Sequence, residues 1–350
     1  MVDSKKSWKA WLYLSPAIIL LLIFTVWPII NSLIMAFYEN YNAFTEFSLV
    51  DFFKNFGIGN FVYALFGVSL QDIIKDGLAT TMQSSGTNFI ITSFDDIAYK
   101  GLGALGNTLL LTFITVPIST LLALLIAVAL NSIKPLQRFY QTVFFLPYIT
   151  NSIAIGLVFQ AMFAIVRPSS MLEPDSVGIV NTILQPILSL FGQSYIDWLA
   201  GEGIEGYIAK VVVTSVYIIW NALPFKILIL MGGLQSISKQ YYDAAKVDGT
   251  SKFRTFTRIT VPLLSPMLSY VIITSFISGF KEYSSVVSLF PEDTMVESGQ
   301  MATMVGYIYQ FIGGESIQYG TAAAAALILF VIIFAVTRVN LYVSKKNTHY

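Results

Sequence analysis

Six long apolar stretches constrain what this chain can fold into. They lie near residues 11–37, 104–131, 139–165, 207–233, 266–290 and 318–342. The hydrocarbon core of a bilayer is about 30 Å thick, and a helix needs about 20 residues to cross it. In lipid, only helices and closed barrels satisfy every backbone polar group. We therefore expect an all-α integral membrane protein with six transmembrane helices.

The composition supports a membrane protein. Hydrophobic residues make up 55% of the 350 residues and charged residues 11%, whereas soluble domains contain about 25% charged residues. The 20 basic residues balance the 20 acidic ones, which predicts no nucleic-acid partner. The chain has no cysteine, and His349 is its single histidine. We therefore expect no disulfide, no metal site, no catalytic residue and no cofactor held by this chain itself.

The distribution of lysine and arginine predicts the orientation. Thirteen of them lie in the N-terminal tail, in the 132–138 and 235–262 connections and at the C-terminal end. The other connections contain Lys54, Lys75, Lys100 and Arg167. They also hold most of the acids, including Asp95, Asp96, Glu173, Asp175, Glu292 and Asp293. Because basic connections stay in the cytoplasm, we expect both termini there, in a multi-pass membrane protein. The first stretch is too long for a cleavable signal peptide and is expected to remain as a span.

We expect one transmembrane domain over residues 1–350, with its core at 104–342. Residues 38–103 are then a long extracellular insertion. The external connection after the third span contains IVNTILQPILSLF (179–191), which predicts a short helix. This helix either lies on the membrane surface or packs against protein as an ordinary amphipathic helix.

A polar segment interrupts the apolar pattern within 235–262. One face of a predicted first helix carries small or apolar residues: Ile237, Tyr241, Ala244 and Ala245. Asp248-Gly249 predicts its end, because glycine adopts left-handed backbone angles without cost. A second helix, capped by Thr250 or Ser251, carries Phe253, Phe256 and Ile259. VPLLSP is expected to break the chain back into the membrane. The pattern favours docking into another protein over a solvated loop with a surface helix.

The segment YYDAAKVDGTSKFRTFTRITVPLLSP (241–266) resembles the EAA signature of permease subunits in ATP-binding-cassette importers. The matching positions are Asp243, Ala244, Ala245, Gly249, Ile259 and Pro262. The family usually has glutamate where Asp243 stands. The resemblance implies a cytoplasmic coupling helix between the fourth and fifth spans. The residues implied to couple this chain to an ATPase are Asp243, Ala244, Ala245, Gly249 and Phe253.

Other stretches resemble the maltose-type sugar permeases, specifically the first of their two non-identical subunits. These are YLSPAIILLLIFTVWPIINSL (13–33), GIGNFVYAL (57–65), LGNTLLLTFITVP (105–117), QTVFFLPYITNSIAIGLVF (141–159) and YGTAAAAALIL (319–329). Residues 66–100 match no pattern of that family. FPEDTMVESG (290–299) stands where the family has Gly-Gly-Pro.

The resemblance also implies which side chains contact a carbohydrate. By position in the third, fourth and fifth spans they are Tyr148, Ser152, Asn221, Phe225, Ser278, Gly279 and Glu282. Aromatic faces with hydroxyl and amide partners suit a sugar ring and its hydroxyl groups. Alternatively, Tyr148 and Phe225 are packing residues, and Asn221 bonds backbone groups freed by Pro224.

Lys226, Lys281 and Glu282 are charged residues within the predicted spans that need an explanation. Such charges are costly in lipid and usually line a cavity. Lys226 either does so or extends to the cytoplasmic surface. For Lys281 and Glu282 there are three alternatives. They form ion pairs with groups of a partner subunit, they contact the solute, or they lie at the extracellular end of the span.

The resemblance implies the permease subunit of a binding-protein-dependent sugar importer, located in the bacterial plasma (inner) membrane. Its partners would be a second, non-identical permease subunit, an ATPase dimer that binds ATP and Mg, and an extracellular or periplasmic solute-binding protein. The chain lacks the G-x-x-x-x-G-K-[ST] motif, so we expect no enzyme activity from it alone. Alternatives are an importer of another polar solute such as glycerol phosphate, and a self-contained secondary transporter. The latter usually shows repeated halves, and no repeat is evident here. A membrane enzyme is disfavoured by the absent cysteine and the single histidine.

Overall fold

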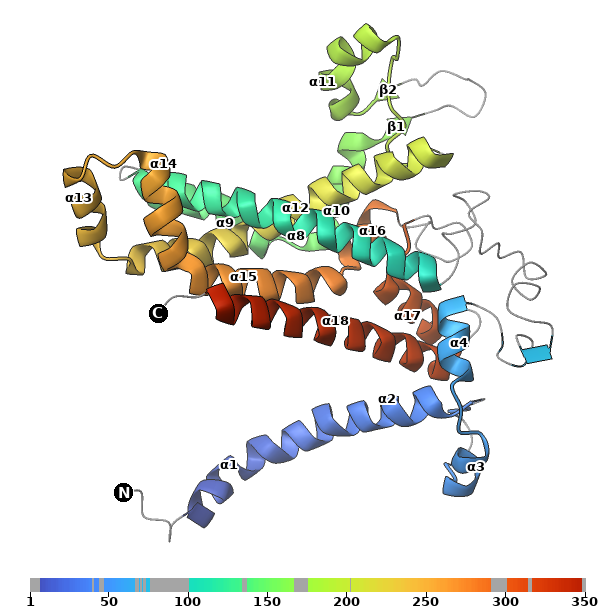
Figure 1. Ribbon diagram of the computed structural model, residues 1–350. Helices are drawn as coiled ribbons and strands as arrows, with labels where there is room; N and C mark the ends of the chain where they lie inside the picture. Colours follow the sequence, from blue (N-terminus) through green and yellow to red (C-terminus); the bar gives the residue numbers. More distant parts are fainter. Residues whose placement is uncertain are drawn as a thin grey trace. The chain divides into compact units, whose positions relative to one another are not determined.

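The computed structural model describes residues 7–39, 41–43, 47–66, 69, 71, 74–75, 101–133, 137–166, 176–201, 203–290, 301–313 and 317–347. Figure 1 shows the ribbon with its helices and strands labelled. The chain divides into two compact units. The first contains Met1–Phe89 and Ile308–Ile328, and the second contains Ile90–Tyr307 and Leu329–Tyr350. The prediction of a single permease domain stays a prediction.

Several sequence predictions fall outside the described residues. They include residues 76–100 of the predicted insertion and, apart from Phe290, the turn FPEDTMVESG. They also include charged residues that predicted the orientation: Lys5, Lys6, Asp95, Asp96, Lys100, Lys134, Arg167, Glu173, Asp175, Glu292 and Asp293.

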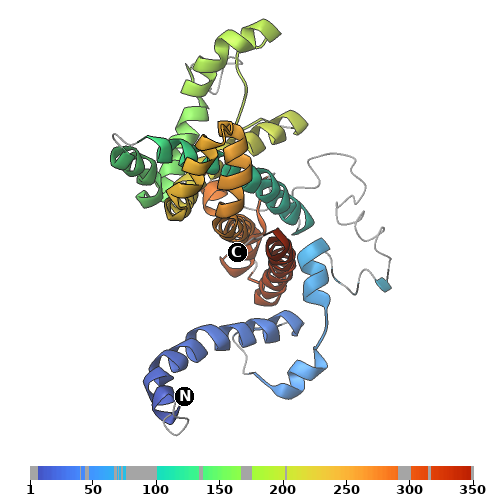
Figure 2. The ribbon, with the colours of Figure 1, turned by 60° about the vertical axis from the view of Figure 1, so that its left-hand side comes forward.

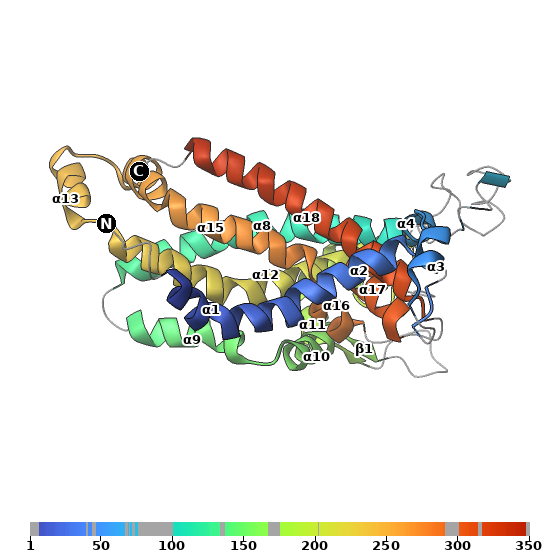
Figure 3. The ribbon, with the colours of Figure 1, turned by 90° about the horizontal axis from the view of Figure 1, so that it is seen from below.

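Three long helices form the centre of the second unit. They are α8 (Gly101–Ser132), α12 (Gly203–Ser236) and α15 (Val261–Phe280), which run side by side (Figure 3). Their shared core contains Ala123, Leu124, Ala127, Leu130, Ile227, Leu230, Met231, Leu234, Leu264 and Val271. Small residues such as Ala123 and Ala127 let membrane helices approach closely. Two predicted spans, 104–131 and 207–233, correspond to α8 and α12.

The predicted third span, 139–165, is divided into two helices. These are α9 (Gln137–Ile149) and α10 (Ser152–Phe163), which meet at an angle of 96°. Asn151 lies at the break, where its side chain accepts hydrogen bonds from the amides of Ile153 (2.9 Å) and Ala154 (3.4 Å) and so caps α10. The third span is predicted from hydropathy, which does not detect a helix cap.

The predicted fifth span, 266–290, was placed too late in the chain. An unbroken helical run of α14 (Lys252–Thr255), a π-turn (Phe256–Thr260) and α15 extends over Lys252–Phe280. VPLLSP therefore does not break the chain, and this prediction is wrong. Pro262 lies in the first turn of α15, directly after the π-turn. A proline nitrogen cannot donate a hydrogen bond, and the wider π-turn lets the helix continue without that bond. After Phe280 the chain forms the separate helix α16 (Ser284–Leu289), which packs on α10.

The predicted helix over 179–191 is present as α11 (Ile179–Leu188) and a 3₁₀ turn (Ser189–Phe191). Strands β1 (Ile165–Val166) and β2 (Ser176–Val177) pair antiparallel before it. Figure 2 shows α11 beyond the C-terminal end of α10. Its packed face carries Asn181, whose side-chain oxygen accepts from the Trp198 indole at 3.1 Å. Its apolar stripe is exposed within this chain: Ile179, Ile183, Ile187 and Leu190. The other face of α11 packs within this chain, where Leu188 is buried and Val180 contacts the core. The two alternatives for this helix stay predictions.

The first unit begins with a long helical run over the predicted span 11–37. It consists of α1 (Ser7–Leu21), a π-turn (Leu22–Val26) and α2 (Trp27–Phe37). Two short helices follow, α3 (Leu49–Lys54) and α4 (Gly59–Phe66). The Asn60 amide ties α4 to the end of α2 by donating to the carbonyls of Met35, Ala36 and Tyr38.

The helices α17 (Met304–Gly313) and α18 (Tyr319–Asn347) contribute residues to both units. The predicted span 318–342 corresponds to α18. In all, the described residues contain five helices long and apolar enough to cross a membrane, or six if α9 and α10 count as one span.

Candidate functional site

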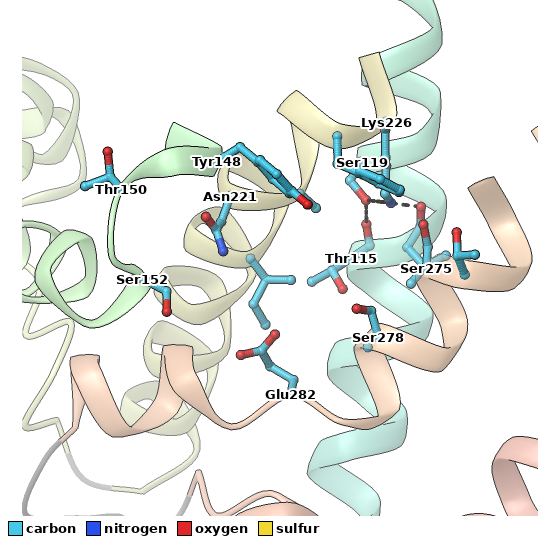
Figure 4. Close-up of a pocket in the computed structure, with 16 residues that line it drawn as sticks. Thr115, Ser119, Tyr148, Thr150, Ser152, Asn221, Lys226, Ser275, Ser278 and Glu282 are labelled. Atoms are coloured by element: carbon cyan, nitrogen blue, oxygen red, sulfur yellow. Dashed lines mark hydrogen bonds between the residues drawn. The ribbon is translucent and has the colours of Figure 1, made fainter. Parts of the chain in front are cut away.

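A cavity of about 520 Å³ lies within the second unit (Figure 4). This volume is within the range of small-molecule sites. Its walls come from α8, the α9–α10 break, α12 and the end of α15. They are formed by Thr115, Val116, Ser119, Tyr148, Thr150, Ser152, Ile218, Asn221, Ala222, Phe225, Lys226, Thr274, Ser275, Ser278, Gly279 and Glu282.

All the residues expected to contact a solute line this one cavity. They are Tyr148, Ser152, Asn221, Phe225, Ser278, Gly279 and Glu282. Local structure explains how they come together. Tyr148 and Ser152 flank the helix break, and Asn221 and Phe225 are one turn apart on α12. Their role as solute contacts stays a prediction.

An aromatic pair forms one wall of the cavity. The rings of Tyr148 and Phe225 stack with centroids 6.0 Å apart and an interplanar angle of 19°. Phe145 supports Tyr148 at 5.1 Å. The Tyr148 side chain remains 53% exposed in the isolated chain, so it is not simply a core residue. Such a wall offers an apolar ring face together with a phenolic hydroxyl.

Hydroxyl side chains form much of the remaining wall, and the sequence reasoning missed most of them. Thr115 and Ser119 come from α8, and Thr274 and Ser275 from α15. A signal for the α8 pair was present, because the buried hydroxyl residues Thr108, Thr112, Thr115 and Ser119 follow helical spacing in an otherwise apolar run.

Gly279 brings α15 close to α8. A Cβ atom at this position would lie 2.9 Å from the methyl group of Thr112. The small residue is therefore needed for the two helices to approach beside the cavity.

The three charged residues of interest lie in different surroundings. Lys226 is 3% exposed and lines the cavity. Its ammonium group donates to the hydroxyls of Ser119 (2.6 Å) and Thr120 (3.2 Å), so it does not extend to the surface. Glu282 also lines the cavity, and its carboxylate accepts from the amide of Ser285 at 3.0 Å. Lys281 is exposed at the end of α15 and is not part of the lining.

A second candidate site is the helix pair at the end of the bundle where α12 ends. There α13 (Lys239–Val247) precedes α14, as Figure 1 shows. Asp248 and Gly249 follow α13, and Gly249 has φ +65°. The predicted helix end is thus confirmed. Of the two proposed caps, Ser251 accepts from the amide of Arg254 and begins α14.

The predicted small apolar face of α13 is divided. Ala245 is 5% exposed and packs inward, whereas Ala244 and Tyr241 face outward. The outward apolar surface also includes Val247 (88% exposed) and Phe253 (76% exposed). The predicted phenylalanine stripe is divided too, since Phe256 packs against the core of the bundle.

Asp243 is an exposed acid within this pair. The ammonium of Lys246, one turn later, lies 3.2 Å from its carboxylate. Exposed pairs of this kind contribute little free energy, about 0.3–0.5 kcal/mol. The carboxylate can therefore exchange this partner for another cation at small cost.

The sequence pattern of the binding-protein-dependent transport system inner membrane component family matches residues 119–349. The chain belongs to this family. The match includes both candidate sites, apart from Thr115 and Val116 of the cavity wall. The chain is therefore a membrane permease component.

Individual relatives of this inner membrane component are transport proteins for saccharides. The arabinooligosaccharides transport system permease protein AraP of Bacillus subtilis is 30% identical over 242 residues, covering 69% of this chain and 71% of the relative. The lactose transport system permease protein LacF of Rhizobium radiobacter is 24% identical over 340 residues, 97% of this chain and 95% of its own.

A solved structure shares the fold of this inner membrane component. It is a chain of a bacterial ABC transporter involved in the import of the acidic polysaccharide alginate. The TM-score is 0.68 at 20% identity, and 99% of this chain and 98% of the other are covered. At this identity the likeness concerns the fold alone.

Proposed function

We propose that this chain forms half of the translocation pathway of a saccharide importer. The observation that carries the proposal is the cavity, where the seven residues implied by the resemblance to sugar permeases lie together. Stacked aromatic rings, hydroxyls, an amide and a carboxylate are suited to a sugar. The relatives named for arabinooligosaccharides and lactose support the same substrate class.

The α13–α14 pair is the contact to an ATPase in this proposal. Tyr241, Val247 and Phe253 are exposed apolar side chains on a short, capped helix pair. Such a surface suits insertion into a groove of another protein. ATP and Mg are then bound by the ATPase, and this chain contributes movement of α12 and α15, which flank the pair.

The remaining partners follow from the family. A second, non-identical permease subunit completes the pathway, and a solute-binding protein delivers the saccharide from outside. Both termini and the α13–α14 pair lie in the cytoplasm, as the distribution of basic residues predicts. Glycerol phosphate and other polar solutes remain alternatives to a saccharide.

Reconstitution into liposomes tests the proposal. The assembly of this chain, the second permease subunit and the ATPase should take up a labelled oligosaccharide when its binding protein and ATP are present. Without the ATPase, uptake should stop. Uptake by this chain alone, with no ATP, would contradict the proposal and favour a secondary transporter.

A further inference from the structure

We infer that the solute carries a negatively charged group, a carboxylate or a phosphate, that binds the ammonium of Lys226. This inference rests on the proposed function, because it assigns the chemistry of the solute to the same cavity. It narrows the substrate class from saccharides in general to acidic or phosphorylated ones.

The first argument is the uncompensated charge of Lys226. The side chain is 3% exposed on a membrane-spanning helix and lines the cavity. In the part of the chain that the structure describes, its hydrogen-bond partners are two neutral hydroxyls, those of Ser119 and Thr120. A buried charge is costly unless an opposite charge accompanies it. An anionic group entering the cavity would supply that charge.

The second argument is that the Lys226 ammonium is fixed in position with one hydrogen atom free to donate to a ligand. The Ser119 hydroxyl donates its proton to the carbonyl of Thr115 within α8, so its lone pairs are available to Lys226. An ammonium has three hydrogen atoms to donate. Two are directed at Ser119 and Thr120, which leaves one for an oxygen of the solute. A charge-assisted hydrogen bond of this kind is stronger than a neutral one.

The third argument concerns Glu282, the other charged residue of the cavity. No ion pair joins it to Lys226 within the described residues. Figure 4 shows the two at separate places on the wall, with Thr115 and Ser278 between them. A saccharide can therefore present its acidic group to Lys226 and its hydroxyls to Glu282, which accepts hydrogen bonds. A neutral saccharide would leave the charge of Lys226 unmatched.

Lys210 provides a matched control for Lys226. It lies on the same helix, α12, and is 5% exposed, but it does not line the cavity. Replacing either lysine removes one buried cation from this helix. Only Lys226 should affect the choice of solute.

The experiment measures binding of matched probes to the complete purified assembly by thermal shift. The members of each pair differ in their acidic groups. Methyl glucoside and methyl glucuronide differ by one carboxylate, glucose and glucose phosphate by one phosphate, and galactotriose and trigalacturonate by three carboxylates. In the wild type, the acidic member of at least one pair should bind about tenfold more tightly than its neutral counterpart. Lys226→Met should abolish this preference. Lys226→Arg and Lys210→Met should retain it.

Two results would overturn the inference: a wild-type assembly that prefers no acidic probe, or a preference that persists in Lys226→Met. If Lys226→Met does not assemble, Lys226→Gln replaces it, and the wild-type comparison remains decisive. Uptake assays separate this inference from the proposed function. ATP-driven uptake of neutral probes without acidic preference refutes the inference alone. Acidic binding that depends on Lys226, without ATP-driven uptake of any probe, refutes the proposed function alone.

Discussion

At the scale of single residues, Gly249 determines how the helix pair turns. Its φ of +65° lies in the left-handed region, and no atom lies within 4 Å of the position a Cβ would take. A side chain is therefore opposed by backbone strain and not by a clash. That strain is about 1–2 kcal/mol for ordinary residues and greater for β-branched ones.

Gly249→Val should separate ATP hydrolysis from transport. The strained turn would change the angle between α13 and α14, so ATPase activity should persist while uptake falls severalfold. Both rates can be measured in proteoliposomes. Gly192→Val is the matched control, because Gly192 also has a positive φ, +73°, and open space around it, but lies outside the helix pair. Equal effects of the two variants would argue against a coupling role for Gly249.

Tyr148→Ala and Asn221→Ala should each weaken solute binding while leaving the assembly intact. Tyr148 contributes the stacked ring and Asn221 an amide, and each contact is worth about 1 kcal/mol. The concentration for half-maximal uptake should therefore rise about fivefold. Tyr140→Ala on the same helix, α9, should have no effect, because Tyr140 does not line the cavity. Unchanged uptake of several saccharides would make Tyr148 and Asn221 structural.

At the scale of elements, the break between α9 and α10 gives the cavity one of its walls. Thr150 and Ser152 line the cavity, and Asn151 between them caps α10. A continuous helix over this stretch would distribute these side chains around its circumference. We therefore expect the cap to hold this part of the cavity wall in place.

Asn151→Ala should lower the stability of the assembly and weaken solute binding together. Loss of an N-cap costs about 0.5–2 kcal/mol. The expected readouts are a lower melting temperature and a higher half-saturation concentration. Asn151→Ser and Asn151→Asp keep a capping oxygen and should restore both values. A fall in stability without any change in binding would show that the break does not position the cavity wall.

At the scale of the whole molecule, the proposed function requires another protein to dock at the α13–α14 pair. Phe253 is 76% exposed there, and Phe256, one turn later, packs into the bundle. The two phenylalanines look alike in the sequence but lie in opposite surroundings. Phe256 packs against the core, and the proposed function assigns the exposed Phe253 to the contact with a partner.

Phe253→Ser should weaken the attachment of the ATPase by about tenfold or more, since buried aromatic anchors dominate many interfaces. Co-purification and ATPase binding to the solubilised permease measure this effect. Tyr342→Ser is the control, because Tyr342 on α18 is comparably exposed, at 74%, but lies outside the helix pair. Normal ATPase attachment in Phe253→Ser would place the docking surface elsewhere.

The sequence by itself determined the class of protein, four spans to within a few residues and the turn at Gly249. Each of these is a local property. Lipid requires about 20 consecutive apolar residues, and a left-handed turn requires glycine, whatever lies nearby. The resemblance to sugar permeases added the seven predicted solute contacts, which the structure places in one cavity.

Only the tertiary structure decided the break at Asn151, the continuous helix through Pro262 and the surroundings of Lys226. The sequence allowed Lys226 either to reach the surface or to line a cavity. Its partner Ser119 is 107 positions away on α8, and only the packing of α8 on α12 brings the two within 2.6 Å. A charge acquires its surroundings from neighbours in space, and local patterns do not specify those neighbours.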